Sequence, residues 1–97
     1  MVLEYIINMT NLNAHITAKF KRTVDIDVVE DYDANTATSE VLNERFKAGE
    51  QVSFVVTALG EDPVTKKTDE NVWDIQLDDG TSIFGVDAGL FDVVKRS

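Results

Sequence analysis

The alternation of apolar and polar residues predicts strands, and it is clearest between Val72 and Val94. Every second residue from Trp73 to Leu77 is apolar, which is the period of a strand with one buried face. Asp79-Gly80 follows, and this dipeptide predicts a tight hairpin turn because it accepts positive φ angles. Residues 83–86 then predict the return strand, and residues 91–94 predict a third, short strand.

The first half of the chain carries a longer alternating pattern. Alternate residues over 3–9 predict a first strand, and the even-numbered residues from Ala14 to Val28 are apolar apart from Arg22. This unbroken parity favours one long strand over 14–29 that bends near Arg22, because a turn would usually reset the register. A hairpin that turns at 21–23 is the alternative, although this tripeptide contains none of the residues that favour turns.

The middle of the chain predicts an exposed loop, a short helix and a further strand. Residues 30–35 are acidic and turn-forming, so we expect them to form the loop. Residues 36–48 contain better helix formers whose apolar members share one helical face, and Gly49 stands where a C-terminal cap belongs. A strand is the alternative for the part of this segment nearest Phe46. Strict alternation over 51–58 predicts another strand.

Several short strands joined by turns, with one short helix, predict a mainly β fold. The architecture expected is a small barrel or a rolled antiparallel sheet. A length of 97 residues predicts a single domain. Within it, residues 1–35 would form a long N-terminal β-hairpin with its acidic turn, residues 36–48 the helix, and residues 49–97 the barrel portion.

The second half of the chain has the pattern of a known barrel module. The features that carry the pattern are residues 48–52 (Ala-Gly-Glu-Gln-Val), the strand over 73–77, Asp79-Gly80 and the closing residues 91–94. With them the segment resembles the SH3-like barrels found in many adaptor and phage-encoded modules. The resemblance implies a long loop between the first two barrel strands, for which residues 60–71 are the counterpart. The aromatic cluster with which signalling SH3 domains grip proline-rich peptides is absent, so that activity is not expected. An OB-like barrel is the alternative topology.

The charge balance argues against a nucleic-acid-binding protein. The chain has 18 acidic and 9 basic side chains, a net charge of −9. Residues 1–48 carry 8 acids and 5 bases, and residues 49–97 carry 10 acids and 4 bases, so the net charges are −3 and −6. This acidity repels phosphate backbones, and direct binding to DNA or RNA is therefore not expected.

The chain has no cysteine, no signal-peptide pattern and no apolar run long enough to span a membrane. These features predict a cytoplasmic protein that does not enter a membrane.

No motif in the sequence predicts catalysis. His15 is the single histidine, and no serine or carboxylate stands beside it to suggest a triad. Asp31-x-Asp33-x-Asn35 begins like a calcium-binding EF-hand loop, but Thr36 and Leu42 stand where that loop needs glycine and glutamate. We therefore expect neither an enzyme nor a bound cofactor or metal.

An acidic cluster is the candidate interaction surface. It comprises Asp25, Asp27, Glu30, Asp31 and Asp33. Two of these carboxylates, Asp25 and Asp27, share the polar face of a predicted strand, where like charges destabilise the sheet. Such charges are neutralised by a neighbouring strand, protect an exposed edge from aggregation, or attract a basic partner.

These observations predict a non-catalytic protein–protein interaction or assembly module. Its expected partner is another protein, with a basic protein favoured by the charge, or a second copy bound through an exposed strand edge. The alternative is a small acidic inhibitor that mimics nucleic-acid charge and blocks a basic nucleic-acid-binding protein. The chain is similar in size and charge to phage-encoded anti-restriction and anti-CRISPR proteins, which belong to that class.

Overall fold

The computed structural model describes residues 11–33 and 38–97, with side chains described over 11–30 and 40–97. Seven strands form one antiparallel sheet, and a single 3-10 turn, η1 (Ala88–Leu90), interrupts the path between the last two. The strands are β1 (His15–Phe20), β2 (Val24–Asp33), β3 (Thr38–Phe46), β4 (Gln51–Glu61), β5 (Thr68–Leu77), β6 (Ser82–Asp87) and β7 (Phe91–Arg96). The expected fold class, a mainly β protein built as a small barrel or rolled antiparallel sheet, is confirmed.

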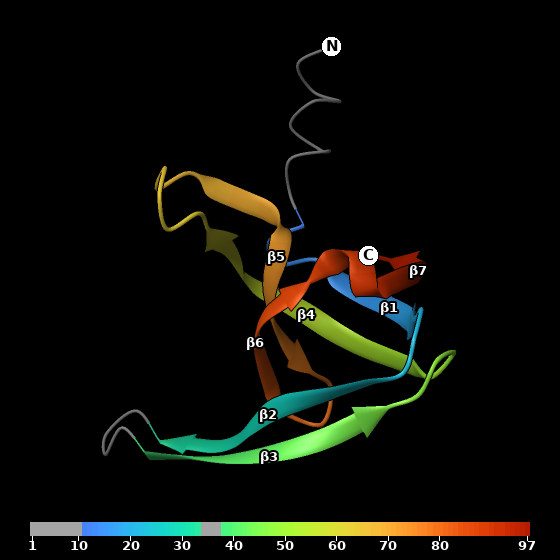
Figure 1. The fold of residues 1–97 in the computed structure, drawn as a ribbon. Helices are drawn as coiled ribbons and strands as arrows, with labels where there is room; N and C mark the ends of the chain where they lie inside the picture. Colours follow the sequence, from blue (N-terminus) through green and yellow to red (C-terminus); the bar gives the residue numbers. More distant parts are fainter. Residues whose placement is uncertain (1–10, 34–37) are drawn as a thin grey trace.

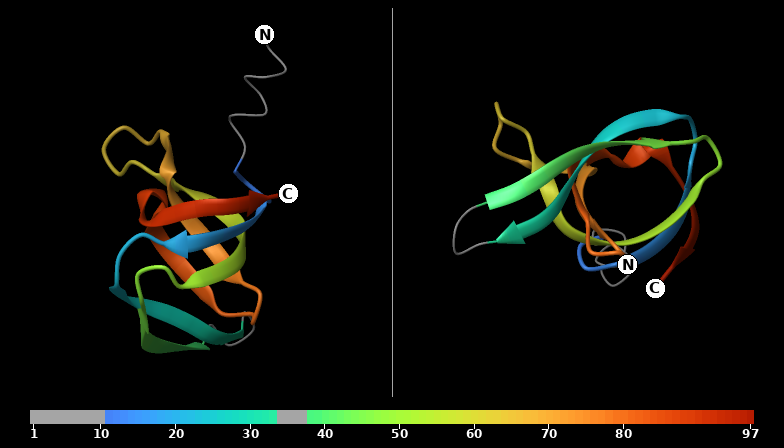
Figure 2. Two further views of the ribbon diagram at one scale, coloured as in Figure 1. Left: turned by 90° about the vertical axis from the view of Figure 1, so that its right-hand side faces the viewer. Right: turned by 90° about the horizontal axis from the view of Figure 1, so that it is seen from below.

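The sheet curls on itself and leaves its first and last strands as edges. The strand order is β3-β2-β6-β5-β4-β1-β7. Seen from below, the strands follow a ring, and β2 and β3 extend beyond it as a two-stranded hairpin (Figure 1, Figure 2). We call this hairpin, residues 24–46, the ribbon. β1 and β4 are paired neighbours, so the ribbon is an excursion between two adjacent strands of the ring.

The ribbon joins the rest of the sheet at one register position. Val29 of β2 pairs with Ser82 of β6, and no other β2–β6 pair is formed within the described residues. The base of the ribbon is closed by hydrogen bonds to the ring: the backbone N–H groups of Phe20 and Gly49 donate to the carbonyls of Glu50 and Phe20, at 3.0 and 2.7 Å. Buried Val28 and Phe46 hold the ribbon to the core.

The core is built from the alternating apolar residues of the strands and centres on a group of aromatic rings. Phe91 lies 5.0 Å from both Phe20 and Phe54, measured between ring centroids, and stacks on Trp73 at 6.1 Å. Phe46 of the ribbon stacks on Phe20 at 4.7 Å. Trp73, which is 4% exposed, donates its indole N–H to the carbonyl of Glu70 at 3.0 Å. The buried set is Ile16, Ala18, Phe20, Val28, Phe46, Phe54, Val56, Trp73, Ile75, Leu77, Ile83, Val86, Leu90 and Phe91.

The predicted β5–β6 hairpin is confirmed. Residues 73–77 lie in β5, and Gly80 turns with a φ of +93°, a backbone conformation that glycine adopts without strain. Residues 83–86 and 91–94 lie in β6 and β7 as expected, and residues 51–58 lie in β4. The predicted strand over 3–9 lies outside the described residues.

The predicted single strand over 14–29 is wrong, and so is its alternative, a hairpin turning at 21–23. Residues 15–20 and 24–33 are separate strands that do not pair with each other. The chain turns a corner between them, where the Lys21 N–H donates to the Leu90 carbonyl at 2.9 Å. Buried Phe20 and Val28 lie on either side of the corner, so the parity of the sequence continues although the strand ends.

The predicted helix over 36–48 is also wrong, because Thr38–Phe46 is strand β3, which pairs with β2. The expected apolar face is divided: Val41 is 56% exposed, whereas Phe46 is buried. Pairing with the preceding strand β2 overrides a weak local helical preference. The alternative, a strand for the part nearest Phe46, is confirmed. The loop expected over 60–71 is shorter, since β4 and β5 reach Glu61 and Thr68.

Candidate interaction surface

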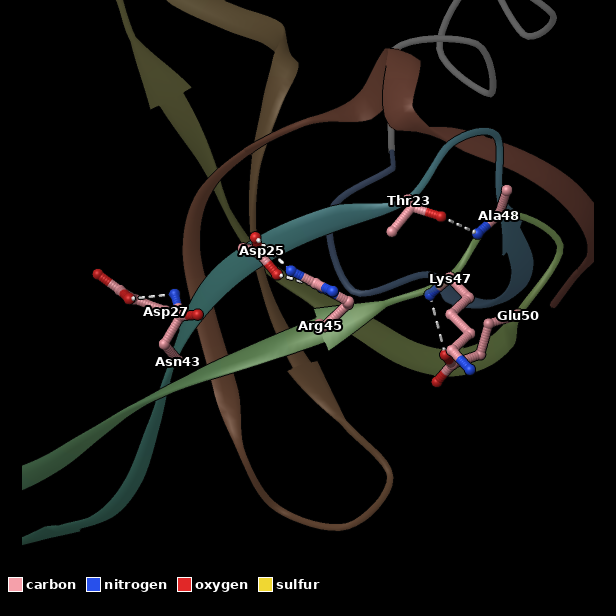
Figure 3. Close-up of polar contacts among 8 residues, drawn as sticks. All are labelled: Thr23, Asp25, Asp27, Asn43, Arg45, Lys47, Ala48 and Glu50. Carbon is pink, nitrogen blue, oxygen red and sulfur yellow. Dashed lines mark hydrogen bonds and ion pairs between the residues drawn. The ribbon is translucent and has the colours of Figure 1, made fainter.

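The two strand carboxylates of the predicted acidic cluster face the neighbouring strand β3. Arg45 donates from Nε to Asp25 Oδ1 at 2.9 Å and from Nη2 to Oδ2 at 3.4 Å, and Asn43 Nδ2 donates to Asp27 Oδ1 at 3.0 Å (Figure 3). The hydrogen bond and charge of Arg45 lower the pKa of Asp25 below its ordinary value, while Asp25 raises the pKa of Arg45. Neighbouring side chains therefore already satisfy part of the hydrogen-bonding capacity of both carboxylates.

Of the remaining members of the cluster, only Glu30 has a described side chain. Glu30 lies opposite Glu40 of β3, and its even position places it on the other face of β2 from Asp25 and Asp27. Asp31 and Asp33 belong to β2, but their side chains lie outside the described ones, as does Asn35 of the partial EF-hand pattern that is not expected to bind calcium. Among the cluster members whose side chains are described, Glu30 therefore lies apart from Asp25 and Asp27.

The edge of β3 is a feature that the sequence analysis missed. β3 stands at the end of the sheet order, and within the described residues it pairs only with β2. Its register is continuous from Glu40 to Phe46, with no bulge to end pairing. Val41 and Leu42 are 56% and 39% exposed, on opposite faces of the strand. A regular edge strand with exposed apolar side chains is a template for pairing with another chain.

The ribbon also carries most of the net charge. Residues 24–46 contain seven acidic side chains and one basic side chain, a net of −6 within a total of −9. The strand edge with exposed apolar groups is therefore surrounded by negative charge. Charge of one sign around a binding surface accelerates association with a partner of opposite sign and disfavours like-charged partners.

The other candidate groups are exposed. His15 Nε2 lies 3.1 Å from Asp78 Oδ1, and the two side chains are 45% and 60% exposed. Among the described side chains, those of residues 11–30 and 40–97, no group of three or more histidine or carboxylate side chains lies together as a metal site. An open, mainly apolar groove of about 310 Å³ lies where β2 diverges from β6, with Ile26, Phe84 and Leu90 among its lining residues.

Comparison with protein-family models, with curated proteins and with solved structures finds no match for this chain. In the part of the chain that the structure describes, no helix is long and apolar enough to cross a membrane. The function is therefore inferred from the geometry and charge of the molecule.

Proposed function

We propose that this protein is a non-catalytic interaction module that binds a partner protein through the open edge of β3. The observation that carries the proposal is that edge itself: within the described residues, β3 pairs on one side only and exposes Val41 and Leu42. A partner strand added there gains main-chain hydrogen bonds, and the side chains of β3 supply specificity.

The position and charge of the ribbon support this proposal. The ribbon extends beyond the ring, so a partner strand can reach β3 without disturbing the core (Figure 1). Its net charge of −6 favours a basic partner segment.

The SH3-like resemblance is retained within the proposal. The loop that it implies between the first two barrel strands, predicted over 60–71, would then be the connection between β4 and β5, residues 62–67. The cysteine-free composition supports a cytoplasmic location.

A pair of matched variants tests the proposal. Partners are captured by crosslinking in the source cells, and the affinity of each identified protein is then measured with purified components. Val41→Lys/Leu42→Lys places charge on the β3 edge and should weaken binding about tenfold or more. Val64→Lys makes the same chemical change at an 86% exposed position between β4 and β5, and should leave binding unchanged. Equal affinities for both variants, with circular dichroism showing intact folds, would overturn the proposal.

The charge of the ribbon also favours a second candidate, the acidic inhibitor that occupies the nucleic-acid site of a basic protein. The two mechanisms differ in the residues and conditions on which they depend. Charge mimicry predicts that binding falls steeply with salt and with Asp25→Asn/Asp27→Asn, because screening shortens the Debye length to about 3 Å at 1 M salt. Strand addition predicts that Val41→Lys/Leu42→Lys has the larger effect. Binding that resists both salt and the asparagine substitutions would exclude the inhibitor.

A further inference from the structure

The sheet has a second open edge, β7, at the opposite end of the strand order. Within the described residues β7 pairs only with β1. Val93 and Val94 are 48% and 56% exposed on this strand, and Lys95 is also exposed. Viewed from the side, β7 lies at one end of the curled sheet and the ribbon at the other (Figure 2).

The charge of this second edge is opposite to that of the ribbon. Residues 15–23 and 91–96, which form β1, the corner and β7, contain five basic side chains and one acidic side chain, a net of +4 with histidine neutral. We call these residues the basic edge. Its basic members are Lys19, Lys21, Arg22, Lys95 and Arg96. The fold thus places a group of net +4 at one open edge and a group of net −6 at the other, within a chain of net −9.

We propose that the β3 edge of one copy receives β7 of a second copy, so that the protein assembles head to tail. The inference rests on the proposed function, because it uses the same open edge of β3. Opposite charges attract the two edges, and exposed valines of β7 can cover the exposed apolar side chains of β3. β3 spans nine residues and β7 six, and the bulge of β7 at Val94 leaves residues 91–93 as the regular stretch that pairs along β3.

The charge distribution also selects this arrangement over a symmetric dimer. A two-fold contact between two β3 strands would bring together two ribbons that each carry −6. A contact between two different edges avoids this repulsion and leaves one free edge of each kind. Such heterologous contacts build a ring where the rotation closes and a filament where it does not.

Reciprocal charge reversal tests the assembly with the full chain. Glu40→Lys/Glu44→Lys reduces the net charge of the ribbon from −6 to −2, and Lys19→Glu/Lys95→Glu reduces that of the basic edge from +4 to 0; all four side chains are exposed. Sedimentation velocity of the wild type should give a mass that rises with protein concentration and falls with added salt. Each variant alone should associate about tenfold more weakly or worse, because the attraction between a ribbon of −6 and a basic edge of +4 falls when either charge is reduced. An equimolar mixture should form a one-to-one complex, because the ribbon of Lys19→Glu/Lys95→Glu keeps its charge of −6 and the basic edge of Glu40→Lys/Glu44→Lys keeps its charge of +4.

The outcomes separate this inference from the proposed function. A wild type that stays monomeric at all concentrations overturns the head-to-tail assembly. An equimolar mixture of the two variants that forms no complex, when each variant alone has lost association, overturns it as well. Normal assembly of Lys19→Glu/Lys95→Glu, together with equal or stronger assembly of Glu40→Lys/Glu44→Lys, identifies the symmetric β3 dimer, whose repulsion between ribbons the lysines relieve, and overturns the role of β7. Either result leaves strand addition at β3 standing. The proposed function itself fails only where Val41→Lys/Leu42→Lys binds partners as the wild type does. Circular dichroism and the unfolding midpoint of each variant confirm that it is folded.

Discussion

Phe91 is predicted to be among the side chains that contribute most to stability, because three other rings meet it in the core. Its ring is 4% exposed and contacts Phe20, Phe54 and Trp73 at centroid distances between 5.0 and 6.1 Å. Phe91→Ala removes this buried ring and leaves a cavity, for which about 3–5 kcal/mol is the usual cost. Since small domains are stable by only about 5–15 kcal/mol in total, the midpoint of thermal unfolding should fall by at least about 12 °C.

Urea unfolding followed by far-UV circular dichroism measures this loss. Trp73 fluorescence is a poor probe here, since Phe91 stacks on the indole and the substitution changes its surroundings directly. Val94→Ala is the matched control on the same strand: its side chain is 56% exposed, so its stability should stay within about 0.5 kcal/mol of the wild type. A loss below about 1 kcal/mol for Phe91→Ala would refute the view that the ring cluster holds the core together.

Two further predictions concern backbone packing and pH. A Cβ at Gly60 would lie 2.6 Å from Val72 Cβ, so Gly60→Ala should lower the free energy of unfolding by about 1–3 kcal/mol. Thermal unfolding should show a smaller loss when the same substitution is made in a Val72→Gly variant, which lacks that Cβ. An equal loss in both backgrounds would refute the clash. Thr81 donates to Asp79 Oδ1 from N at 3.0 Å and from Oγ1 at 2.7 Å, which lowers the pKa of Asp79. Because the pKa of Asp79 is lower in the folded state, its ionised carboxylate stabilises the fold at pH values above the unfolded-state pKa of about 3.9. This stabilisation is lost as the pH falls through the folded-state pKa. Asp79→Asn should therefore lose less stability than the wild type between neutral pH and about pH 3, measured as urea midpoints; equal losses would contradict the assignment.

The parts of the fold that the sequence predicts are those set by local signals. The β5–β6 hairpin follows from alternation on both sides of Asp79-Gly80, a turn whose glycine needs no distant partner. The corner at 21–23 has no such signal, because alternation fixes the face of a residue but not the point at which a strand changes partners. The sequence predicts β3 only as the alternative for the residues nearest Phe46, because the strand depends on pairing with β2, and Val41 and Leu42 suit an exposed helix as well as an edge strand.

The candidate surface depends even more on the topology. Which strands become edges is decided by the order of the sheet, which no local pattern encodes. The total charge of −9 is visible in the sequence, and dividing the chain at its middle places more of it in the second half. The fold instead separates a ribbon of −6 from a basic edge of +4, because β1 and β7 come together from opposite ends of the chain. The predicted pair Asp25 and Asp27 lies on the ribbon, but its partners Arg45 and Asn43 came from a segment expected to be helical.

The pairing of β1 with β4 has a consequence for how this chain can change over evolutionary time. Residues 21–50 leave the ring and return to it between two strands that are already neighbours, and hydrogen bonds between Phe20 and residues 49–50 close the base of that excursion. Insertions, deletions and substitutions toward the far end of the ribbon therefore leave the order of the ring strands unaltered. Surface excursions of this kind tolerate changes in length at small entropic cost. The proposed recognition element can thus diverge quickly while its scaffold is conserved, and the same ring can serve chains that recognise different partners.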